Sequence, residues 1–318
     1  MIPDFLIRAD GRDLTALVKD RLISIVITDG EGIEADTLEI TIDNRDLAVA
    51  EPPTGARLSV ALGYAGEALT EMGSWTVNGT GGSGPVETLV VRAEPADLAG
   101  PIRSPRTQSW EDTTLGGIVR SIAARAGLRD FTSPSLAGVP IAYEAQTAES
   151  DLHFVTRLAA RFDAIAKPAD GRLVVAKRGE GIGDPISVRR ADGAIAWNWD
   201  RGEREKYASV TARYDDPDAG KEGTVEVGSG EPVRELRRVH ASEAEARAAA
   251  NAALGKAGRG EVTYHVDLPR FRGDLYGGGR VELDGFAAAM DGLGELRTVT
   301  HTLDGAGLVT AFDGARTA

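Results

Sequence analysis

The chain has 318 residues, long enough for two or three domains, and its 42% hydrophobic and 27% charged residues exclude intrinsic disorder. Its 36 basic and 49 acidic residues give a net charge of −13, the wrong sign for a nucleic-acid-binding or polybasic membrane surface. Cysteine is absent, which excludes disulfides, thiol nucleophiles and cysteine-ligated metals.

The first hundred residues alternate between apolar and polar positions with a period of two, which is typical of half-buried β-strands. In the stretch 37–43, for example, Leu38, Ile40 and Ile42 share one face. Turn residues at 29–32 and at 52–55 separate such stretches. The expected strands are 21–28, 37–43, 58–64, 75–77 and 89–91.

Residues 101 to about 180 change to helical spacing. Apolar side chains at intervals of three and four predict one helix up to about Ala126 and a second that Ser150 opens. Asp112 or Thr113 is the expected N-cap of the first helix, and Gly127 its C-terminal stop. A turn at 170–171 then leads into a short strand at 173–175. We interpret this region as a small α+β insert.

Strands return after Ile195. Period-two alternation is present at 207–214, 223–227, 233–239, 262–268, 281–283, 299–303 and 308–312. One alanine-rich helix, 242–257, interrupts them, with a capping box formed by Ser242 and Glu245 and a stop at Gly258. The segment 195–214 fits either the end of the first strand-rich domain or the start of the second.

The fold prediction is therefore a mainly β protein with an α+β insert. We expect one antiparallel β-barrel domain over 1–100, the insert over 101–194 and a second barrel over 195–318. The second barrel would carry the helix 242–257, and the two barrels would be weakly related copies of one structure.

Residues typical of catalysis or metal binding do not form recognisable motifs in this sequence. The histidines at 153, 240, 265 and 301 lack metalloprotease spacing, and we expect structural or surface roles for them. The carboxylate pairs Asp215/Asp216, Glu34/Asp36 and Asp200/Glu203 are neighbours that 49 acidic residues supply by chance. We predict no catalytic residue, no cofactor-binding residue, no metal site and no enzymatic activity.

Two glycine-rich stretches and one tryptophan pair are expected to have structural roles. The stretch 79–84 lacks the Gly-Lys-Ser/Thr ending of a phosphate loop and is expected to be a hairpin loop, while 277–279 is expected to be a bulge or tight turn. Trp197 and Trp199 share one face of a strand, which favours packing in a core or interface. A sugar-stacking platform is the alternative.

No signal peptide precedes the first strand, and no run of about 18 apolar residues is long enough to cross a membrane. We therefore expect the chain to fold in a cytoplasm and to make no membrane contact.

The order of several motifs resembles the phage late control gene D proteins. The similarity begins with 29–32 and the acidic strand 35–43, continues through 53–64, and includes Ser109-Trp110, 114–128 and Gln146 in the insert. The run 149–159 is similar to a signature shared with type VI secretion spike proteins, and 299–301 with Thr310 resembles the closing hairpin. The resemblance covers nearly the whole chain.

This resemblance implies a baseplate hub of a contractile phage tail or tailocin, assembled in the bacterial host cytoplasm and incorporated into the virion. Such a hub is a homotrimer whose two tube-like barrels per subunit form a pseudo-hexameric ring. It would join the hexameric tail tube to the trimeric central spike, contact the tape measure protein and other baseplate subunits, and leave a lumen through which DNA passes without specific binding. The spike would be a separate protein, and peptidoglycan cleavage is not expected.

Two alternatives stay open at this stage. One is a tail tube protein, which shares the barrel but usually has a single domain and forms hexamers. The other is a carbohydrate-binding or glycan-cleaving tail component that uses Trp197, Trp199 and nearby carboxylates. The acidity suggests a lumen that repels DNA phosphates, although it could equally serve solubility.

Overall fold

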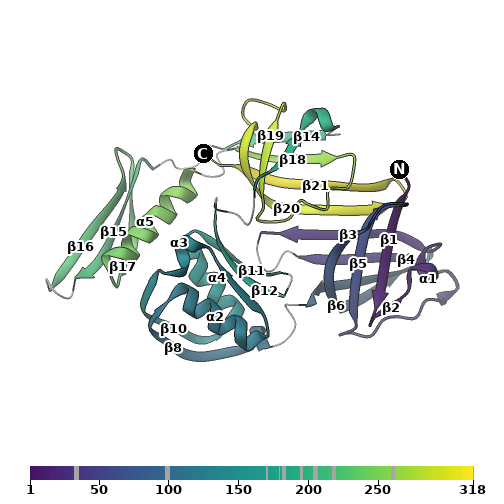
Figure 1. The fold of residues 1–318 in the computed structure, drawn as a ribbon, viewed down its shortest axis with the longest axis horizontal. Coiled ribbons are helices and arrows are strands. Elements are labelled where there is room, and N and C mark those ends of the chain that lie inside the picture. Colours follow the sequence, from purple (N-terminus) through teal and green to yellow (C-terminus); the bar gives the residue numbers. More distant parts are fainter. Residues whose placement is uncertain are drawn as a thin grey trace.

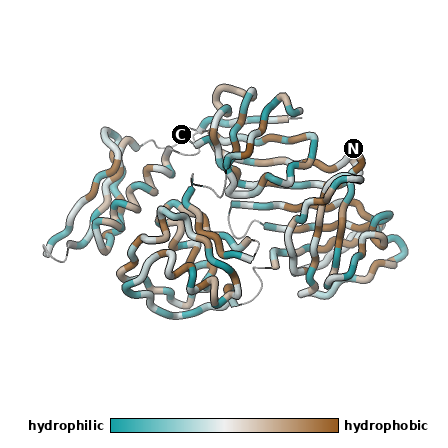
Figure 2. The backbone as a smooth tube through the Cα atoms, in the orientation of Figure 1, coloured by the Kyte–Doolittle hydropathy of each residue, from teal (hydrophilic) through white to brown (hydrophobic). Residues whose placement is uncertain are grey.

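A computed structural model describes residues 1–31, 36–96, 101–169, 171–178, 180, 184–193, 196–202, 207–216, 220–258 and 262–317. Figure 1 shows strand-rich units at the two ends of the chain, with the helical insert and a smaller helix-and-sheet unit beside them. Four separate clusters of buried apolar side chains form the cores. In Figure 2, hydrophobic and hydrophilic segments alternate along the strands.

The N-terminal strands pack on the first core. They are β1 (Pro3–Ala9), β2 (Arg12–Asp13), β3 (Leu22–Gly30), β4 (Thr37–Asp43), β5 (Arg57–Tyr64), β6 (Thr70–Ser83) and β7 (Thr88–Pro95). The short helices α1 (Thr15–Val18) and η1 (Arg45–Leu47) lie in the connections. Leu38, Ile40 and Ile42 are buried as the alternation predicts, because one face of an antiparallel sheet covers the core.

The C-terminal strands pack on a third core. They are β13 (Ile186–Arg189), β14 (Ala196–Arg201), β18 (Val262–Leu268), β19 (Arg280–Asp284), β20 (Gly292–Asp304) and β21 (Gly307–Arg316), with η4 (Arg190–Asp192) after β13. Tyr264, Val266 and Leu268 are buried on one face of β18, again following the period of two.

These two groups of strands form one 13-stranded sheet. Its main path runs β14-β18-β21-β20-β3-β4-β7-β6-β5-β1-β2, and β13 and β19 extend from β20. Two sets of strands in this sheet follow the same antiparallel order, β3-β4-β7-β6-β5 and β14-β18-β21-β20-β19. The antiparallel pairing of β20 with β3 joins the two sets.

The sheet differs from the expectation of two separate barrels. Among the described residues, the strand path has two ends and closes into no barrel. The reason lies at β3, because the edge that could close the N-terminal strands on themselves pairs instead with β20 from the other end of the chain. The coarser prediction, a mainly β protein with few helices, agrees with the structure.

The insert has its own core between two helices and two small sheets. Its elements are η3 (Pro101–Arg103), β8 (Pro105–Thr114), α2 (Leu115–Ala126), β9 (Arg129–Thr132), α3 (Pro134–Ala137), β10 (Pro140–Ser150), α4 (Asp151–Arg161), β11 (Ala164–Ala169) and β12 (Arg172–Lys177). Thr114, rather than Asp112 or Thr113, caps α2, because its extended backbone lets its hydroxyl accept from the N–H of Gly117. Gly127 ends α2 with a left-handed φ of 72°, as expected.

A three-stranded sheet with one helix forms the remaining unit. It contains β15 (Ser209–Asp216), β16 (Lys221–Gly228), β17 (Val233–His240) and α5 (Glu243–Gly258). Ser242 caps α5 as predicted, since its hydroxyl accepts from the N–H of Glu245 at 3.3 Å. The helix covers this small sheet through Ala246 and Ala250, so it belongs to a core separate from the 13-stranded sheet.

Several predicted features fall outside the described residues. The domain boundaries at 100 and at 194–195 do so, as do Ile195, Glu34, Glu203, Asp170 of the predicted turn and the side chain of Asp216.

Candidate functional site: a charged junction between sheet and insert

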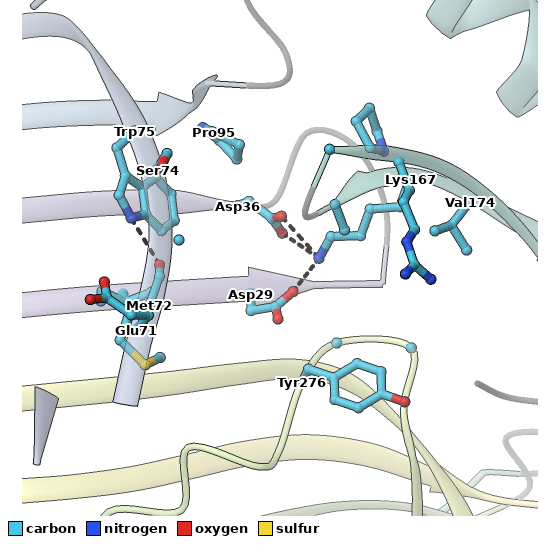
Figure 3. A pocket seen from close by; sticks show the side chains of 18 of the residues that line it. Asp29, Asp36, Glu71, Met72, Ser74, Trp75, Pro95, Lys167, Val174 and Tyr276 are labelled. Carbon is cyan, nitrogen blue, oxygen red and sulfur yellow. Dashed lines mark hydrogen bonds and ion pairs between the residues drawn. The ribbon is translucent and has the colours of Figure 1, made fainter. Parts of the chain in front are cut away.

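A cleft of about 780 Å³ opens where the 13-stranded sheet, the insert and the loop before β19 meet. Met72 and Trp75 of β6 line its sheet wall, Phe131 and Lys167 its insert wall, and Tyr276 lies in the loop. Figure 3 shows the Lys167 side chain extending across this cleft toward the sheet.

Lys167 is the centre of the junction. β11 carries it, and its ammonium group contacts the carboxylate of Asp29 and lies 2.9 Å from Asp36 and from the carbonyl of Gly30 (Figure 3). The Lys167 side chain is only 11% exposed. A buried ammonium group needs partners of this kind because removal from water disfavours its charge.

The pKa values of the pair reflect this burial. Burial lowers the pKa of Lys167, but Asp29 and Asp36 outweigh it, so the pKa rises and the lysine stays charged. Burial raises the pKa of Asp36 to about 6, against the opposing effect of Lys167 and with a further increase from Asp29. The Gly30 N–H also donates to Asp36 at 2.9 Å, which holds the carboxylate at the end of β3.

A second ion cluster lies beside the first. Arg178, just after β12, contacts Glu31 at 2.6 Å and lies 3.8 Å from Glu295 of β20. Burial lowers the pKa of Arg178, but Glu31 and the other nearby carboxylates raise it overall. The insert is therefore joined by two cations to both halves of the 13-stranded sheet, at the point where β3 and β20 pair.

Glycine makes the third contact of the junction. A Cβ at Gly277 would lie 2.4 Å from the backbone of Gly30, so only glycine lets the loop approach the end of β3. The structure thus places 277–279 in a tight approach before β19, in agreement with the turn interpretation.

The acidic signature at the start of α4 has a structural role. Ser150 caps the helix by accepting from the N–H of His153. Asp151, almost fully buried, accepts two hydrogen bonds from Arg125 and one from Gln146. These contacts hold α2, α4 and β10 together, so the signature residues stabilise the insert.

A further group of ions ties the end of α4 to its neighbours. Glu144 contacts Arg157 at 2.8 Å and also contacts Arg161. Arg161 in turn lies 3.6 Å from Glu245 of α5. This cluster therefore connects the insert with the helix of the small three-stranded unit.

The four histidines occupy structural or surface positions. His301 is buried beside Thr310 and Phe271, and burial lowers its pKa to about 4, so it is neutral at pH 7. His240 is buried in β17, while His265 lies between Asp267 and Asp313. His153 is exposed. Within the described residues, no group of three metal-ligating side chains converges.

The two tryptophans of β14 do not form an exposed pair. Trp197 packs edge-to-face on Phe286 with ring centroids 6.1 Å apart, and Arg190 lies over its ring. Trp199 is 42% exposed. Arg201 also lies 6.0 Å from the centroid of the Trp199 ring, so a guanidinium group lies over one face of each indole.

Sequence reasoning did not find the Lys167 junction. Asp29 and Lys167 are 138 residues apart in sequence, and no motif links them. Their one local signal is a lysine in the otherwise apolar strand β11, where an unpaired charge would be costly.

Comparison with known proteins agrees with this architecture. A family model described as phage tail baseplate hub (GPD) matches residues 31–306. The probable baseplate hub protein of Escherichia phage P2 is 33% identical over 98% of this chain and 93% of its own length.

Solved structures share the fold. The 43 kDa tail protein of prophage MuSo2 from Shewanella oneidensis has a TM-score of 0.73 at 16% identity, covering 99% of this chain and 98% of its own. An Escherichia coli component of the type VI secretion system has a TM-score of 0.55 at 13% identity, covering 92% and 73%. No described helix is long and apolar enough to span a membrane.

Proposed function

The chain belongs to the phage tail baseplate hub (GPD) family, and from this we propose that it is a homotrimeric adaptor between tail tube and central spike. As a baseplate hub it is a structural component of the virion tail.

The repeated strand order supports the trimer. Each chain contributes two five-strand sets with the same antiparallel order, which we interpret as two tube-like units. Three chains would therefore present six similar units around one axis. Such a ring could match a sixfold tube on one side and a threefold spike on the other, which resolves the symmetry mismatch between these partners.

The open face of the central strands supports a channel that does not retain DNA. Opposite the core, the same face carries an ion pair between Glu39 and Arg92 and half-buried hydroxyl side chains, among them Ser24, Thr28, Thr41, Thr300 and Thr302. We propose that this face lines the lumen. A face of hydroxyl groups and paired charges, together with a net charge of −13, would let DNA or a tape measure protein pass without binding.

We propose no enzymatic activity for this chain. The charged groups of the junction are paired with one another, and their geometry serves docking of the insert on the sheet. The tail tube protein, the central spike, the tape measure protein and other baseplate subunits are the proposed partners. The tube-protein alternative is not favoured, because the chain carries two strand sets and an insert.

The native mass tests this proposal. Light scattering of the purified chain is expected to give three times the 33.4 kDa of one chain. Imaging of that species should show a ring with six similar lobes. A stable hexamer would favour a tube role, and a chain that stays monomeric at all concentrations would contradict a self-assembling trimer.

A further inference from the structure

We propose that β14 of one chain pairs antiparallel with the second half of β6 in a neighbouring copy, with Trp199 opposite Gly82. This inference rests on the proposed homotrimer and specifies its interface. It follows from a residue-by-residue repeat in the 13-stranded sheet.

The two strand sets match in register as well as in order. β6 and β20 each pair first with a third strand, through Thr70–Thr76 and Gly292–Glu295 respectively. A bulge follows in each, between Val77 and Gly79 in β6 and between Leu296 and Thr298 in β20.

The backbone contacts beside these bulges are also repeated. The carbonyl of Val77 accepts from the N–H of Gly55, and the carbonyl of Leu296 accepts from the N–H of Gly278. Val77 therefore corresponds to Leu296, and Gly79 corresponds to Thr298. Bulges are local features of a strand pair, so their recurrence at one position indicates a true repeat.

The difference between the sets lies beyond the bulge. In β20, the second half (Thr298–Asp304) pairs with β3, the first strand of the other set. In β6, the corresponding residues 79–83 pair with β7 on one side only, within the described residues. The first strand of the second set, β14, likewise pairs only with β18 there.

A second copy of the β20–β3 pairing, formed between two chains, would provide hydrogen-bond partners for the edges of both β6 and β14. If the β20–β3 pairing is repeated between chains, the free half of β6 meets β14 of a neighbour. Such a contact joins different surfaces on the two chains and therefore closes into a ring when the rotation fits. Unpaired edges are otherwise sites of uncontrolled association.

The repeat also fixes the register of this pairing. β14 aligns with β3 through their partners β18 and β4, so that Trp199 corresponds to Ile27. Within the chain, Ile27 lies opposite His301, which corresponds to Gly82. Trp199 of one chain then lies opposite Gly82 of the next, and by the same alignment Asn198 lies opposite Ser83 and Arg201 opposite Thr80.

The side chains at these positions are complementary. Ile27 and His301 are two medium-sized, buried residues that face each other within the chain. Between chains, a large side chain that is 42% exposed would face a residue without one, so the indole would cover the glycine. Thr80 donates to Glu51 at 3.0 Å, which places a carboxylate beside the expected position of Arg201.

This interface accounts for part of the glycine-rich stretch 79–84. Most of it belongs to the strand β6 rather than to a loop. Glycine inside a strand weakens it and often marks the close approach of another backbone. A Cβ added to Gly79 would meet no atom of its own chain within 4 Å, whereas one added to Gly82 would lie 2.8 Å from the carbonyl oxygen of Thr88. Packing within the chain therefore accounts for the glycine at 82 but not for the one at 79.

Cysteine cross-linking tests the register directly, because the chain contains no cysteine. We would combine Asn198→Cys with Ser83→Cys in one chain and oxidise it under native conditions. Opposed residues of an antiparallel pair lie about 4.5–5.5 Å apart between Cα atoms, within the range of a disulfide. The expected product is a covalent ladder that ends at three chains on a non-reducing gel.

The control combines Asn198→Cys with Glu67→Cys, which lies exposed just before the opposite end of β6. It should cross-link about tenfold less, because its thiols are not held together. Native mass is measured for both variants before oxidation. A trimer in which the matched pair links no better than the control would overturn the strand pairing and leave the hub trimer intact. A chain that never associates would overturn both.

Discussion

At the scale of single residues, the Lys167 ammonium is the contact with the largest predicted effect. It neutralises two carboxylates of the sheet from a position that is only 11% exposed. Replacing Lys167 with Met leaves Asp29 and Asp36 close together without a cation. We expect a loss of about 3 kcal/mol in the free energy of unfolding, because one partner of a buried ion cluster is removed.

Urea unfolding followed by tryptophan fluorescence would measure this loss. The matched control is Lys177→Met on the neighbouring strand, whose ammonium is 43% exposed and which should change stability by less than about 0.5 kcal/mol. Equal stability of the two variants would contradict the role of Lys167 in docking the insert.

The raised pKa of Asp36 predicts how the stability of the folded chain changes with pH. Its folded pKa of about 6 lies above the ordinary 3.8, so the folded state holds the proton more tightly. Its contribution to stability is therefore fully present below pH 3.8 and is lost as the pH rises through 6. The wild type should gain stability relative to Asp36→Asn, by about 2 kcal/mol, when the pH falls from about 7 to about 4.5.

His301 changes the stability in the opposite direction over a similar range of pH. Its folded pKa of about 4 lies below the ordinary 6.5, so its contribution is present above 6.5 and is lost as the pH falls through 4. Asp29 and Lys167 line the same cleft as Asp36 and His301. The difference in stability between wild type and Asp36→Asn removes the contribution of His301, whose pKa does not depend on Asp36. Thermal melts at several pH values would measure this difference. A difference that does not depend on pH would contradict the raised pKa.

At the scale of elements, the small unit of β15–β17 and α5 has a core of its own. Ala246 and Ala250 of the helix are fully buried against Val210 and Val225 of the sheet. Small side chains allow the helix to lie close, so a larger one cannot be accommodated without displacement.

We expect Ala250→Leu to destabilise this unit by about 1–3 kcal/mol and to leave the 13-stranded sheet unaffected. Hydrogen exchange would show faster exchange in β15–β17 and unchanged protection in β3 and β20. Ala244→Leu, on the exposed face of α5, is the control and should change neither. Faster exchange throughout the chain would show that the units are not independent.

At the scale of the whole molecule, the charge determines how a channel would treat DNA. With a net charge of −13 per chain, assembly multiplies the negative charge rather than creating a basic surface. We expect the native oligomer to bind a fluorescent DNA duplex more weakly than about 10⁻⁴ M at about 50 mM salt, as measured by anisotropy. Micromolar binding that weakens with added salt would contradict a non-adhesive lumen.

Much of the local structure could be predicted from the sequence. Strands with strict alternation, such as 37–43 and 262–268, and helix signals such as Ser150, Ser242 and Gly127 agree with the structure. Each depends on residues within a few positions of one another, where sterics and capping act without the rest of the fold. The predicted caps of α2, Asp112 or Thr113, are wrong by two residues and by one, since Asp112, Thr113 and Thr114 all carry side-chain oxygens that can cap a helix.

The sequence by itself thus determined the elements, the absence of cysteine chemistry, the acidity and the resemblance to baseplate hubs. Only the tertiary structure decided that β3 pairs with β20, that Lys167 meets Asp29 and Asp36, and that α5 has a separate core. The first two of these contacts join residues far apart in the chain, and no short-range periodicity specifies them. Strand edges choose their partners by geometry and burial across the whole chain, which is why pairing and register become visible only in the folded molecule.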